Sequence, residues 1–287
     1  MENLTPAHHA AAGALAGVVE ISCSQPTITI KNALQDGRTP TMTPRALYTG
    51  WGAGAASIAP ITAVQFGANR FYGGLARDAG LSDNVATRMS TAALAGITSG
   101  AVAGPFEAVV IQQQKVGGGI LETAKRLVNE RGVSRGLFRG ISMTCVREGL
   151  YTMGYLGIAP AIKDALLEQG WSESSAFGTS AVTGGLIACV LTHPSDTIKT
   201  RMQANMDVEE KPQYRSSLST MRHVLGEGGL AGFFSGAAPR ALRLVGAVFI
   251  LNMSKEKIME GMVAAGMGDK AGEGGAQPVA AVAADRA

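Results

Sequence analysis

The chain has 287 residues, of which 46% are hydrophobic and only 16% are charged, and its formal net charge is +3. This composition is too apolar and too poor in charge for an ordinary soluble domain, which makes a membrane protein the first class to test. The small net charge, without a basic tract interleaved with aromatic residues, argues against nucleic acid as a partner. Three widely separated cysteines without metal-ligand spacing predict no metal site and no cofactor.

Six segments approach the roughly 20 apolar residues that a helix needs to cross a bilayer. In chain order they are residues 6–31, 46–69, 89–114, 142–162, 174–195 and 240–254. They predict an all-α membrane protein with six transmembrane helices in a single domain over residues 1–265. Residues 266–287 are rich in Gly and Ala without periodicity, which predicts a disordered tail.

The first, third and fifth segments repeat one pattern around a proline. The three prolines are Pro26, Pro105 and Pro194, and each is followed nine residues later by a glutamine, namely Gln35, Gln114 or Gln203. A proline inside a helix removes a backbone hydrogen bond, so these positions predict helix kinks. An aromatic-x-Gly triplet ends later at Gly50, Gly140 or Gly236, where the next helix is expected to begin. The repetition divides the chain into three repeats over about 8–80, 85–168 and 172–262.

The pattern Pro-x-acid-x-x-base, followed by the aromatic-x-Gly triplet, resembles the signature of the mitochondrial carrier family. The third repeat matches it in full, as Pro194, Asp196, Lys199, Arg201 and Gln203. The resemblance covers about residues 8–260 and implies three pseudo-symmetric repeats around a central cavity that charges near the prolines close on the matrix side. It also implies a monomeric, multi-pass protein of the mitochondrial inner membrane, with cardiolipin as a candidate lipid partner.

Two positions depart from the family pattern together. The first repeat has Ile28 where the family has an acid, and the second has Val110 where it has a base. In the family's cyclic scheme these two would form one ion pair, and replacing a whole buried pair by apolar contact can be neutral for stability. The first repeat also has Pro40 and Pro44, which leave little room for the amphipathic surface helix that the other two repeats can form.

The remaining charges define the expected matrix gate. Its members are Lys31, Glu107, Asp196 and Lys199, braced by Gln35, Gln114 and Gln203. We expect Glu107 to pair with Lys199 and Asp196 to pair with Lys31. On the opposite face, Arg70, Lys163, Lys255 and Lys257 predict a mostly basic rim, with Glu256 as the main nearby acid.

The expected solute contacts come from equivalent positions in the even-numbered helices. Ser57, Arg147 and Arg243 each stand seven residues after the glycine that opens the helix, which is about 10 Å into it. The resemblance implies substrate contact at this level, and we include Glu148 beside Arg147. A charge within a membrane span is costly and faces a cavity or a partner, which adds Glu20. The alternatives are a self-neutralising pair of Arg147 with Glu148 and a cross-helix hydrogen bond of Glu20.

The chemistry of these residues favours a small carboxylate-bearing metabolite. Arginine forks suit carboxylates, and Glu148 can accept an ammonium group, so an amino-acid-like zwitterion is preferred. The stretch around Glu20 is similar to the di- and tricarboxylate branch, which stays the second choice. The function predicted is import or exchange by alternating access, without enzymatic activity. The alternative is a carrier-fold protein that does not transport and serves as a receptor or assembly factor.

Overall fold

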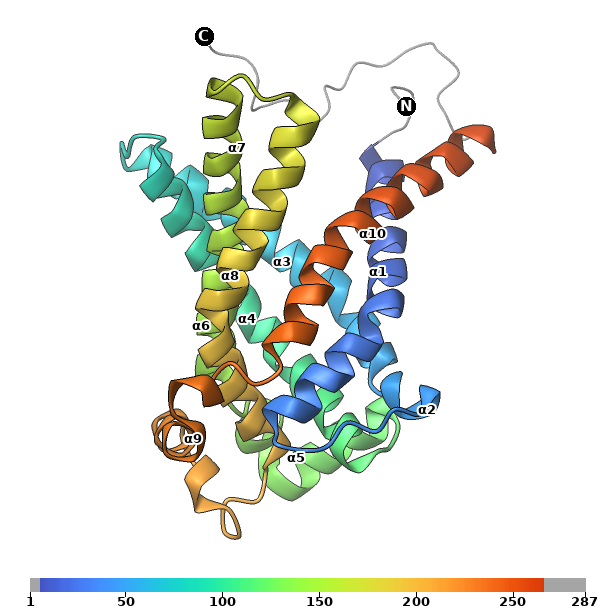
Figure 1. The fold of residues 1–287 in the computed structure, drawn as a ribbon. Helices are drawn as coiled ribbons and strands as arrows, with labels where there is room; N and C mark the ends of the chain where they lie inside the picture. The colour runs from blue at the N-terminus through green and yellow to red at the C-terminus, as the bar shows by residue number, and fades with distance from the viewer. Residues whose placement is uncertain (1–5, 266–287) are drawn as a thin grey trace.

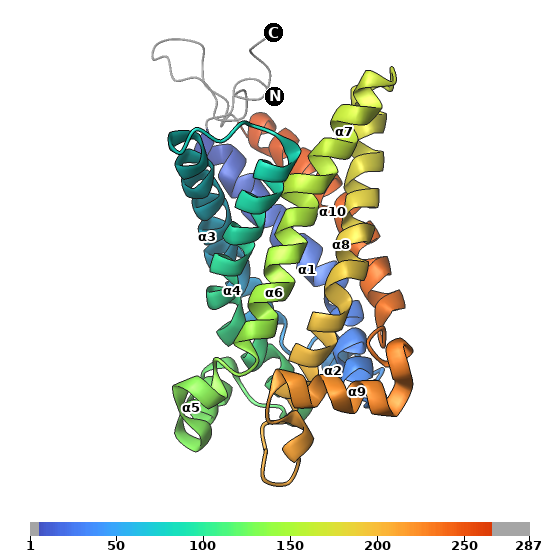
Figure 2. The same cartoon turned by 90° about the vertical axis from the view of Figure 1, so that its left-hand side faces the viewer.

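The computed structural model describes residues 6–265, so the tail predicted over 266–287 lies outside the described residues. The described part is built from helices, and no strand occurs in it. Long helices stand upright side by side, and the shorter α5 and α9 lie across one end of the bundle (Figures 1 and 2). The start of α1 and the end of α10 lie at the opposite end (Figure 1).

The elements follow one another in three helical stretches. The first holds α1 (Pro6–Gln35), α2 (Pro44–Leu47) and α3 (Trp51–Asp78). The second holds α4 (Val85–Val116), α5 (Ile120–Gly136), α6 (Ile141–Thr152), the π-helical η1 (Met153–Ile158) and α7 (Ala159–Glu168). The third holds α8 (Glu173–Ala204), the 3-10 turn η2 (Pro212–Tyr214), α9 (Ser217–Gly232) and α10 (Ala237–Ala264). Neighbouring helices pack in the order α1, α3, α4, α6, α8, α10 and back to α1, which closes a ring.

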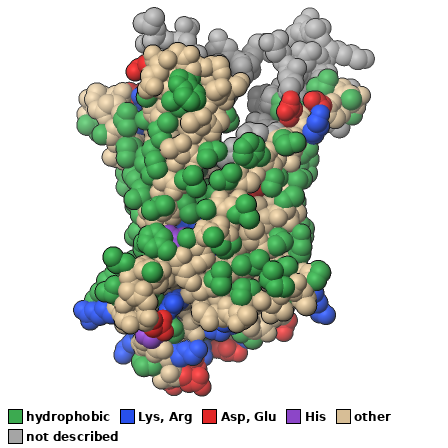
Figure 3. All heavy atoms as spheres, in the orientation of Figure 1, with side chains coloured by type: hydrophobic (Ala, Val, Ile, Leu, Met, Phe, Trp, Pro, Cys, Tyr) green, Lys and Arg blue, Asp and Glu red, His purple; other side chains and the backbone are tan. Residues whose placement is uncertain are grey.

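The surface of the bundle is apolar and its interior is polar. Phe66, Phe71 and Leu75 are more than half exposed on α3, whereas Gln25 and Thr144 are buried. Hydrophobic side chains cover the upright helices, and charged side chains gather at the end that carries α5 and α9 (Figure 3). By length and composition, α4 and α8 each qualify as helices that could cross a membrane. This inverted arrangement fits a bundle whose sides face lipid.

Each expected proline lies inside a long helix rather than at its end. Pro26 lies within α1, Pro105 within α4 and Pro194 within α8. Helix α1 changes direction along its length (Figure 1). All three helices continue for nine or more residues past the proline, and α8 extends to Ala204 instead of stopping at 195. The predicted segment is too short because it was ended at the first charged residues, although the backbone there stays helical.

The second, fourth and sixth long helices, which are α3, α6 and α10, begin where the sequence predicts. Gly50, Gly140 and Gly236 directly precede α3, α6 and α10, and each has a left-handed backbone with φ of 87°, 70° and 77°. Glycine adopts this conformation without steric cost, which explains its use at the three turns. The expected surface helices are also confirmed in the second and third stretches as α5 and α9, while α2 has only four residues.

The three glycines pack against equivalent residues of another helix. A Cβ atom at Gly236 would lie 3.0 Å from the backbone oxygen of Lys31, and one at Gly140 would lie 3.7 Å from that of Lys199. At Gly50 it would lie 3.0 Å from the Cγ1 atom of Val110. The residues contacted stand five positions after Pro26, Pro194 and Pro105 respectively. The same backbone junction therefore occurs at three places in the ring.

Small residues bring α4 and α6 close together. A Cβ atom at Gly100 would lie only 2.8 Å from the Cα atom of Cys145, and one at Gly96 would clash with the backbone of Glu148. Glycine at these positions lets the two backbones approach within a distance that a larger side chain would prevent. This packing sets Arg147 and Glu148 of α6 against the interior face of α4, where Glu107 lies.

Candidate solute site and charge network

Seven charged side chains meet in the interior, contributed by α1, α4, α6, α8 and α10. The bases are Lys31, Arg147, Lys199 and Arg240, and the acids are Glu107, Glu148 and Asp196. Each side chain is less than a quarter exposed. A buried charge is tolerated when it is paired and hydrogen-bonded, which makes these contacts decisive for the stability of the bundle.

Asp196 is the centre of this network. Its carboxylate lies 2.8 Å from Lys31 Nζ, 3.2 Å from Lys199 Nζ and 3.2 Å from Arg240 Nη1. Arg147 Nε lies farther away, at 3.6 Å. The side chain of Asp196 is 2% exposed, and four cations surround this one buried carboxylate. The contact with Lys31, expected from the sequence, joins α8 to α1.

Glu107 connects the expected gate to the expected solute level. Its Oε2 atom accepts from Lys199 Nζ at 3.1 Å, which is the pairing expected from the sequence. Its Oε1 atom accepts from Arg147 Nη2 at 2.5 Å. Arg147 Nη2 also donates to Glu148. Arg147 is therefore bound to two acids from two helices, rather than to its neighbour alone.

The three glutamines act in different ways. Gln35 Nε2 donates to Asp196 Oδ2 at 3.0 Å and so braces an ion pair directly. Gln114 and Gln203 instead donate to backbone carbonyls just before α3 and α6, at 3.2 Å and 3.1 Å. These two side chains tie helix ends together and do not contact the ion pairs that they were expected to brace.

Arg243 and Glu20 come together on the opposite side of the ring from α4. Arg243 Nη2 on α10 lies 3.5 Å from Glu20 Oε1 on α1, and Glu20 also accepts from Ser24 Oγ at 2.8 Å. The Arg243 side chain is 37% exposed, which makes it more accessible than Arg147 at 13%. Ser57 Oγ donates to the Gly54 carbonyl of its own helix at 2.6 Å, rather than to a charged residue.

Arg240, near the start of α10, could either line the cavity or anchor the helix end. The structure places it in the network, since Nη1 contacts Asp196 and Nη2 donates to Thr192 Oγ1 at 2.6 Å. Its position three residues before Arg243 was the available signal, because residues three apart share a helix face. His193 was not predicted from the sequence. Its ring stacks on that of Phe234, and its Nε2 atom lies 3.1 Å from the Ser235 carbonyl oxygen.

The two positions that lack the ion pair hold apolar side chains, and polar contacts lie beside them, since Gln114 bonds to Asn32 and Thr29. Val110 packs against a buried cluster of Ala53, Ala108, Val109 and Leu127, and Ile28 is half-buried on α1. The rim at the other end differs from expectation, because Lys163 Nζ lies 3.1 Å from Glu173 and Lys257 Nζ lies 2.8 Å from Glu260. The prediction of a mostly basic rim with Glu256 as its main acid was therefore wrong at these two lysines.

The ring of helices and its buried ion pairs define a helical membrane protein of the carrier type. The sequence pattern of the family described as mitochondrial carrier protein matches residues 82–170 and 171–265. These two regions make up more than half of the chain, and the protein belongs to the mitochondrial carrier family. Members of this family are transporters. The first 81 residues, which contain Ile28, lie outside the matched regions.

Relatives that match over most of their length are also named as carriers. An uncharacterized mitochondrial carrier of Schizosaccharomyces pombe is 29% identical over 272 residues, covering 87% of this chain and 91% of the relative. A probable mitochondrial 2-oxodicarboxylate carrier of Dictyostelium discoideum is 27% identical over 274 residues, covering 88% and 90%. A mitochondrial carnitine/acylcarnitine carrier-like protein of Arabidopsis thaliana is 26% identical over 278 residues, covering 82% and 91%.

Proposed function

We propose that this protein imports or exchanges a small carboxylate-bearing metabolite across the mitochondrial inner membrane by alternating access. One observation carries the proposal. Within the part of the chain that the structure describes, the contacting network holds four bases and three acids, which leaves one positive charge. A net positive charge inside a low-dielectric bundle attracts an anionic group. A carboxylate would neutralise it.

The proposal includes a domain over residues 1–265 with six tilted spans in three repeats, around a central cavity. The closed ring of helices and the repeated glycine junction support this arrangement. So does the apolar outer surface of helices such as α3, which does not qualify by length and composition as α4 and α8 do. Helices that line a polar interior need apolar residues on their lipid-facing side alone, so their composition understates their fit to a bilayer.

An amino-acid-like zwitterion remains the preferred substrate, with a di- or tricarboxylate as the second choice. The proposed site offers two pairs of opposite charge, Arg147 with Glu148 and Arg243 with Glu20, and the hydroxyl of Ser57. A zwitterion can satisfy both members of such a pair, since its carboxylate binds arginine and its ammonium binds the acid. The relatives named for carnitine and for 2-oxodicarboxylates fit these two choices, because carnitine is a zwitterion and a 2-oxodicarboxylate carries two carboxylates.

Solute binding would rearrange the charge network at Glu107. A solute carboxylate that binds Arg147 competes with Glu107 Oε1, which then keeps only Lys199. The Glu107–Arg147 ion pair is lost as the solute is gained, while the backbones of α4 and α6 stay packed. Binding and opening become one coupled equilibrium, since the solute binds better to the state in which this contact is broken.

A carrier-fold scaffold without transport is the second candidate, and one observation favours it. Arg147 already contacts Glu107 and Glu148, and Ser57 is bonded within its own helix. The hydrogen-bonding groups of such a site are already satisfied by protein partners, without a bound solute. Against this reading, Arg243 is 37% exposed and contacts Glu20 only at 3.5 Å, which leaves a guanidinium free to bind.

The test is a thermal-shift screen of the detergent-purified protein against carnitine, amino acids, 2-oxodicarboxylates, tricarboxylates and nucleotides. A ligand that binds the folded state raises the melting temperature by mass action. We expect one carboxylate class to stabilise the wild type but neither Arg147→Ala nor Arg243→Ala. Lys163→Ala, at the rim, is the matched control and should keep the response. A wild type that responds to no carboxylate while remaining folded would favour the scaffold.

A further inference from the structure

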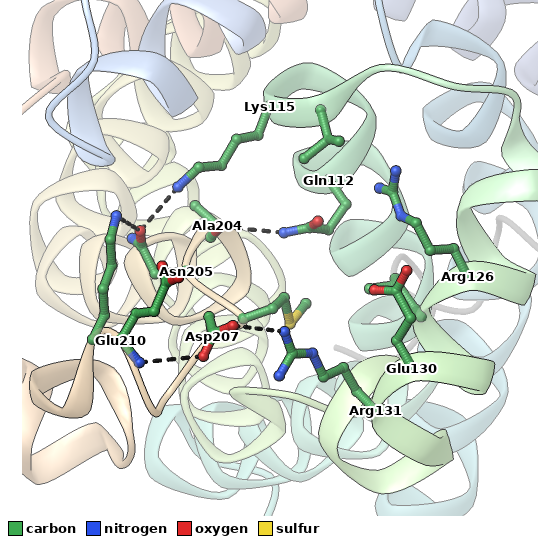
Figure 4. Close-up of a pocket in the computed structure, with 13 residues that line it drawn as sticks. Gln112, Lys115, Arg126, Glu130, Arg131, Ala204, Asn205, Asp207 and Glu210 are labelled. Atoms are coloured by element: carbon green, nitrogen blue, oxygen red, sulfur yellow. Dashed lines mark hydrogen bonds and ion pairs between the residues drawn. The ribbon is translucent and has the colours of Figure 1, made fainter.

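Three polar side chains meet where α1, α4 and α8 end. Asp36 directly follows α1, Lys115 lies in the last turn of α4, and Asn205 directly follows α8. Lys115 Nζ lies 3.4 Å from Asp36 Oδ2, and Asn205 Nδ2 donates to Asp36 Oδ1 at 2.8 Å. Lys115 Nζ also donates to Asn205 Oδ1 at 2.9 Å (Figure 4). We refer to these three residues as the end cluster.

The end cluster is buried and hydrogen-bonded like the central network. The Asp36 side chain is 1% exposed, and Asn205 is 5% exposed. Lys211 Nζ also donates to Asn205 Oδ1 at 2.9 Å. A carboxylate removed from water to this degree is costly unless cations and donors satisfy it, so the contacts to Asp36 matter for how these helix ends are held.

The sequence positions of Asp36 and Lys115 are equivalent. Each stands ten residues after a proline, Pro26 or Pro105. The acid comes from the first repeat and the base from the second, as in the pair that Ile28 and Val110 replace. Asp36 is eight residues beyond Ile28 and Lys115 five beyond Val110, which are shifts of about 12 Å and 8 Å along their helices.

We propose that the Asp36–Lys115 ion pair, supported by Asn205, is a displaced gate contact that closes the junction between the first and second repeats in place of the missing pair. The inference rests on the proposed transport function and deepens it. It gives all three junctions an ion pair from an acid of one repeat to a base of the next. The contact must break each time the matrix side opens, so these residues position the helices for transport without touching the solute.

Two features make this contact suited to opening. Arg38 Nε lies 2.6 Å from Asp36 Oδ2 and belongs to the same repeat, so Asp36 keeps a cation when Lys115 moves away. Lys115 is 23% exposed and borders a cleft of about 340 Å³ that Asn205 also lines (Figure 4). Water in this cleft can solvate the released ammonium group. Neither partner is left as a buried, unpaired charge, which would make opening too costly.

The pairing is tested by charge exchange, which requires no solute. Asp36→Lys and Lys115→Asp should each lower the melting temperature of the purified protein by about 5 °C. The double exchange should recover at least about half of the loss, with Arg38 moving toward solvent. The control is the partly exposed pair Arg131–Asp207, at 3.1 Å, for which the same exchange should change little. Losses at Asp36 and Lys115 that simply add would overturn the pairing.

The opening is tested by cross-linking in liposomes. Asp36→Cys and Lys115→Cys are combined in a chain whose Cys23, Cys145 and Cys189 are serine, and the two thiols are bridged by a reducible bifunctional reagent. Uptake of labelled carnitine and 2-oxoglutarate by the double-cysteine protein should fall at least tenfold on bridging, relative to the same protein before bridging, and return on reduction. The reagent should leave each single-cysteine variant at its own untreated rate. Undiminished uptake in the bridged protein would overturn the gate role. If the wild type transports none of the carboxylates of the thermal-shift screen, the proposed function fails, and the charge exchange still decides the pairing.

Discussion

The first and third helical stretches share a backbone layout but differ in side chains. Each has a long helix with an internal proline, a glycine with positive φ and a second long helix. The third carries Asp196 after its proline and the 16-residue helix α9, whereas the first carries Ile28 and the four-residue α2. Gly50 and Gly236 nevertheless make the same kind of close contact. Backbone packing at a junction is therefore kept even where the charged residues beside it differ.

The largest expected effect is that of removing the carboxylate of Asp196, the acid that the third stretch has where the first has Ile28. Asp196→Asn leaves Lys31, Lys199 and Arg240 without their shared acid, and such a loss costs about 3–5 kcal/mol of stability. Thermal unfolding of the purified protein should show a melting temperature lower by about 10 °C. The control Asp164→Asn, at a site 56% exposed and 3.5 Å from Arg88, should change it by no more than about 2 °C. Equal effects of the two substitutions would contradict the central position assigned to Asp196 in the charge network.

The next effect concerns the pair that joins the second and third stretches. Glu107→Lys and Lys199→Glu should each reduce solute uptake by about two orders of magnitude, since each strands a buried charge. The double exchange should restore only part of it, because Arg147 would then face Lys at position 107 and Asp196 would face Glu at position 199. Initial uptake rates in liposomes measure this. Complete failure of the double variant to exceed the single ones would argue against the pairing.

The glycine junctions allow a comparison of intermediate size. An alanine at any of the three positions is strained by about 1–2 kcal/mol because φ is positive. Gly236→Ala should cost most, since its Cβ meets the rigid backbone of Lys31 at 3.0 Å, and Gly140→Ala least, since its nearest contacts are at 3.7 Å. Gly50→Ala meets a Val110 methyl group that can shift slightly. Melting temperatures in another order would contradict the contacts assigned to these three glycines.

The smallest effect comes from the surface helix that the first stretch lacks. Glu227 on α9 accepts from the Arg201 guanidinium, and this hydrogen bond lowers the pKa of the Glu227 carboxyl. A lowered pKa in the folded state adds stability above about pH 4.3, and the contribution is lost as the pH falls through the folded-state pKa. Because Glu227 is 47% exposed, it contributes less than about 1 kcal/mol.

The matching measurement is the melting temperature of the wild type and Glu227→Gln over a pH series. The wild type should be more stable by about 1–2 °C at pH 7, and the gap should close in acid. His223, whose Nε2 atom lies 3.0 Å from Glu227 Oε1, is kept in both proteins so that they differ only at position 227. A gap that stays constant in acid would show that the difference does not come from this carboxyl.

Much of the fold followed from the sequence because proline, glycine and charge recur at fixed intervals. The starts of α3, α6 and α10 and the contacts of Lys31 and Lys199 with their acids were predicted in this way. The contact of Arg147 with Glu107 was not, because spacing along a chain does not give the rotation of α6 against α4. Helix lengths were underestimated because the predicted spans were ended at charged residues. In the structure these charged residues are paired, and the helices extend through them.

The site itself was less predictable than the helices. The positions of Arg243 and Glu20 were noted separately, and their 3.5 Å approach depends on how α10 packs against α1. Asp36 and Lys115 lie at an equivalent position outside the family motif, so no pattern drew attention to them. The acids Glu173 and Glu260 that pair with rim lysines lie outside the six predicted spans, which is why the sequence predicted a basic rim.

The measurement that tests the central claim most directly is exchange in liposomes that contain the wild type, Arg147→Lys or Arg147→Ala. Vesicles loaded with unlabelled carnitine or 2-oxoglutarate are given the labelled solute outside. We predict exchange of at least one solute by the wild type, reduced exchange by Arg147→Lys, which keeps the charge but not the fork, and none by Arg147→Ala. Exchange by Arg147→Ala at the wild-type rate, or no exchange by a folded wild type, would contradict the account.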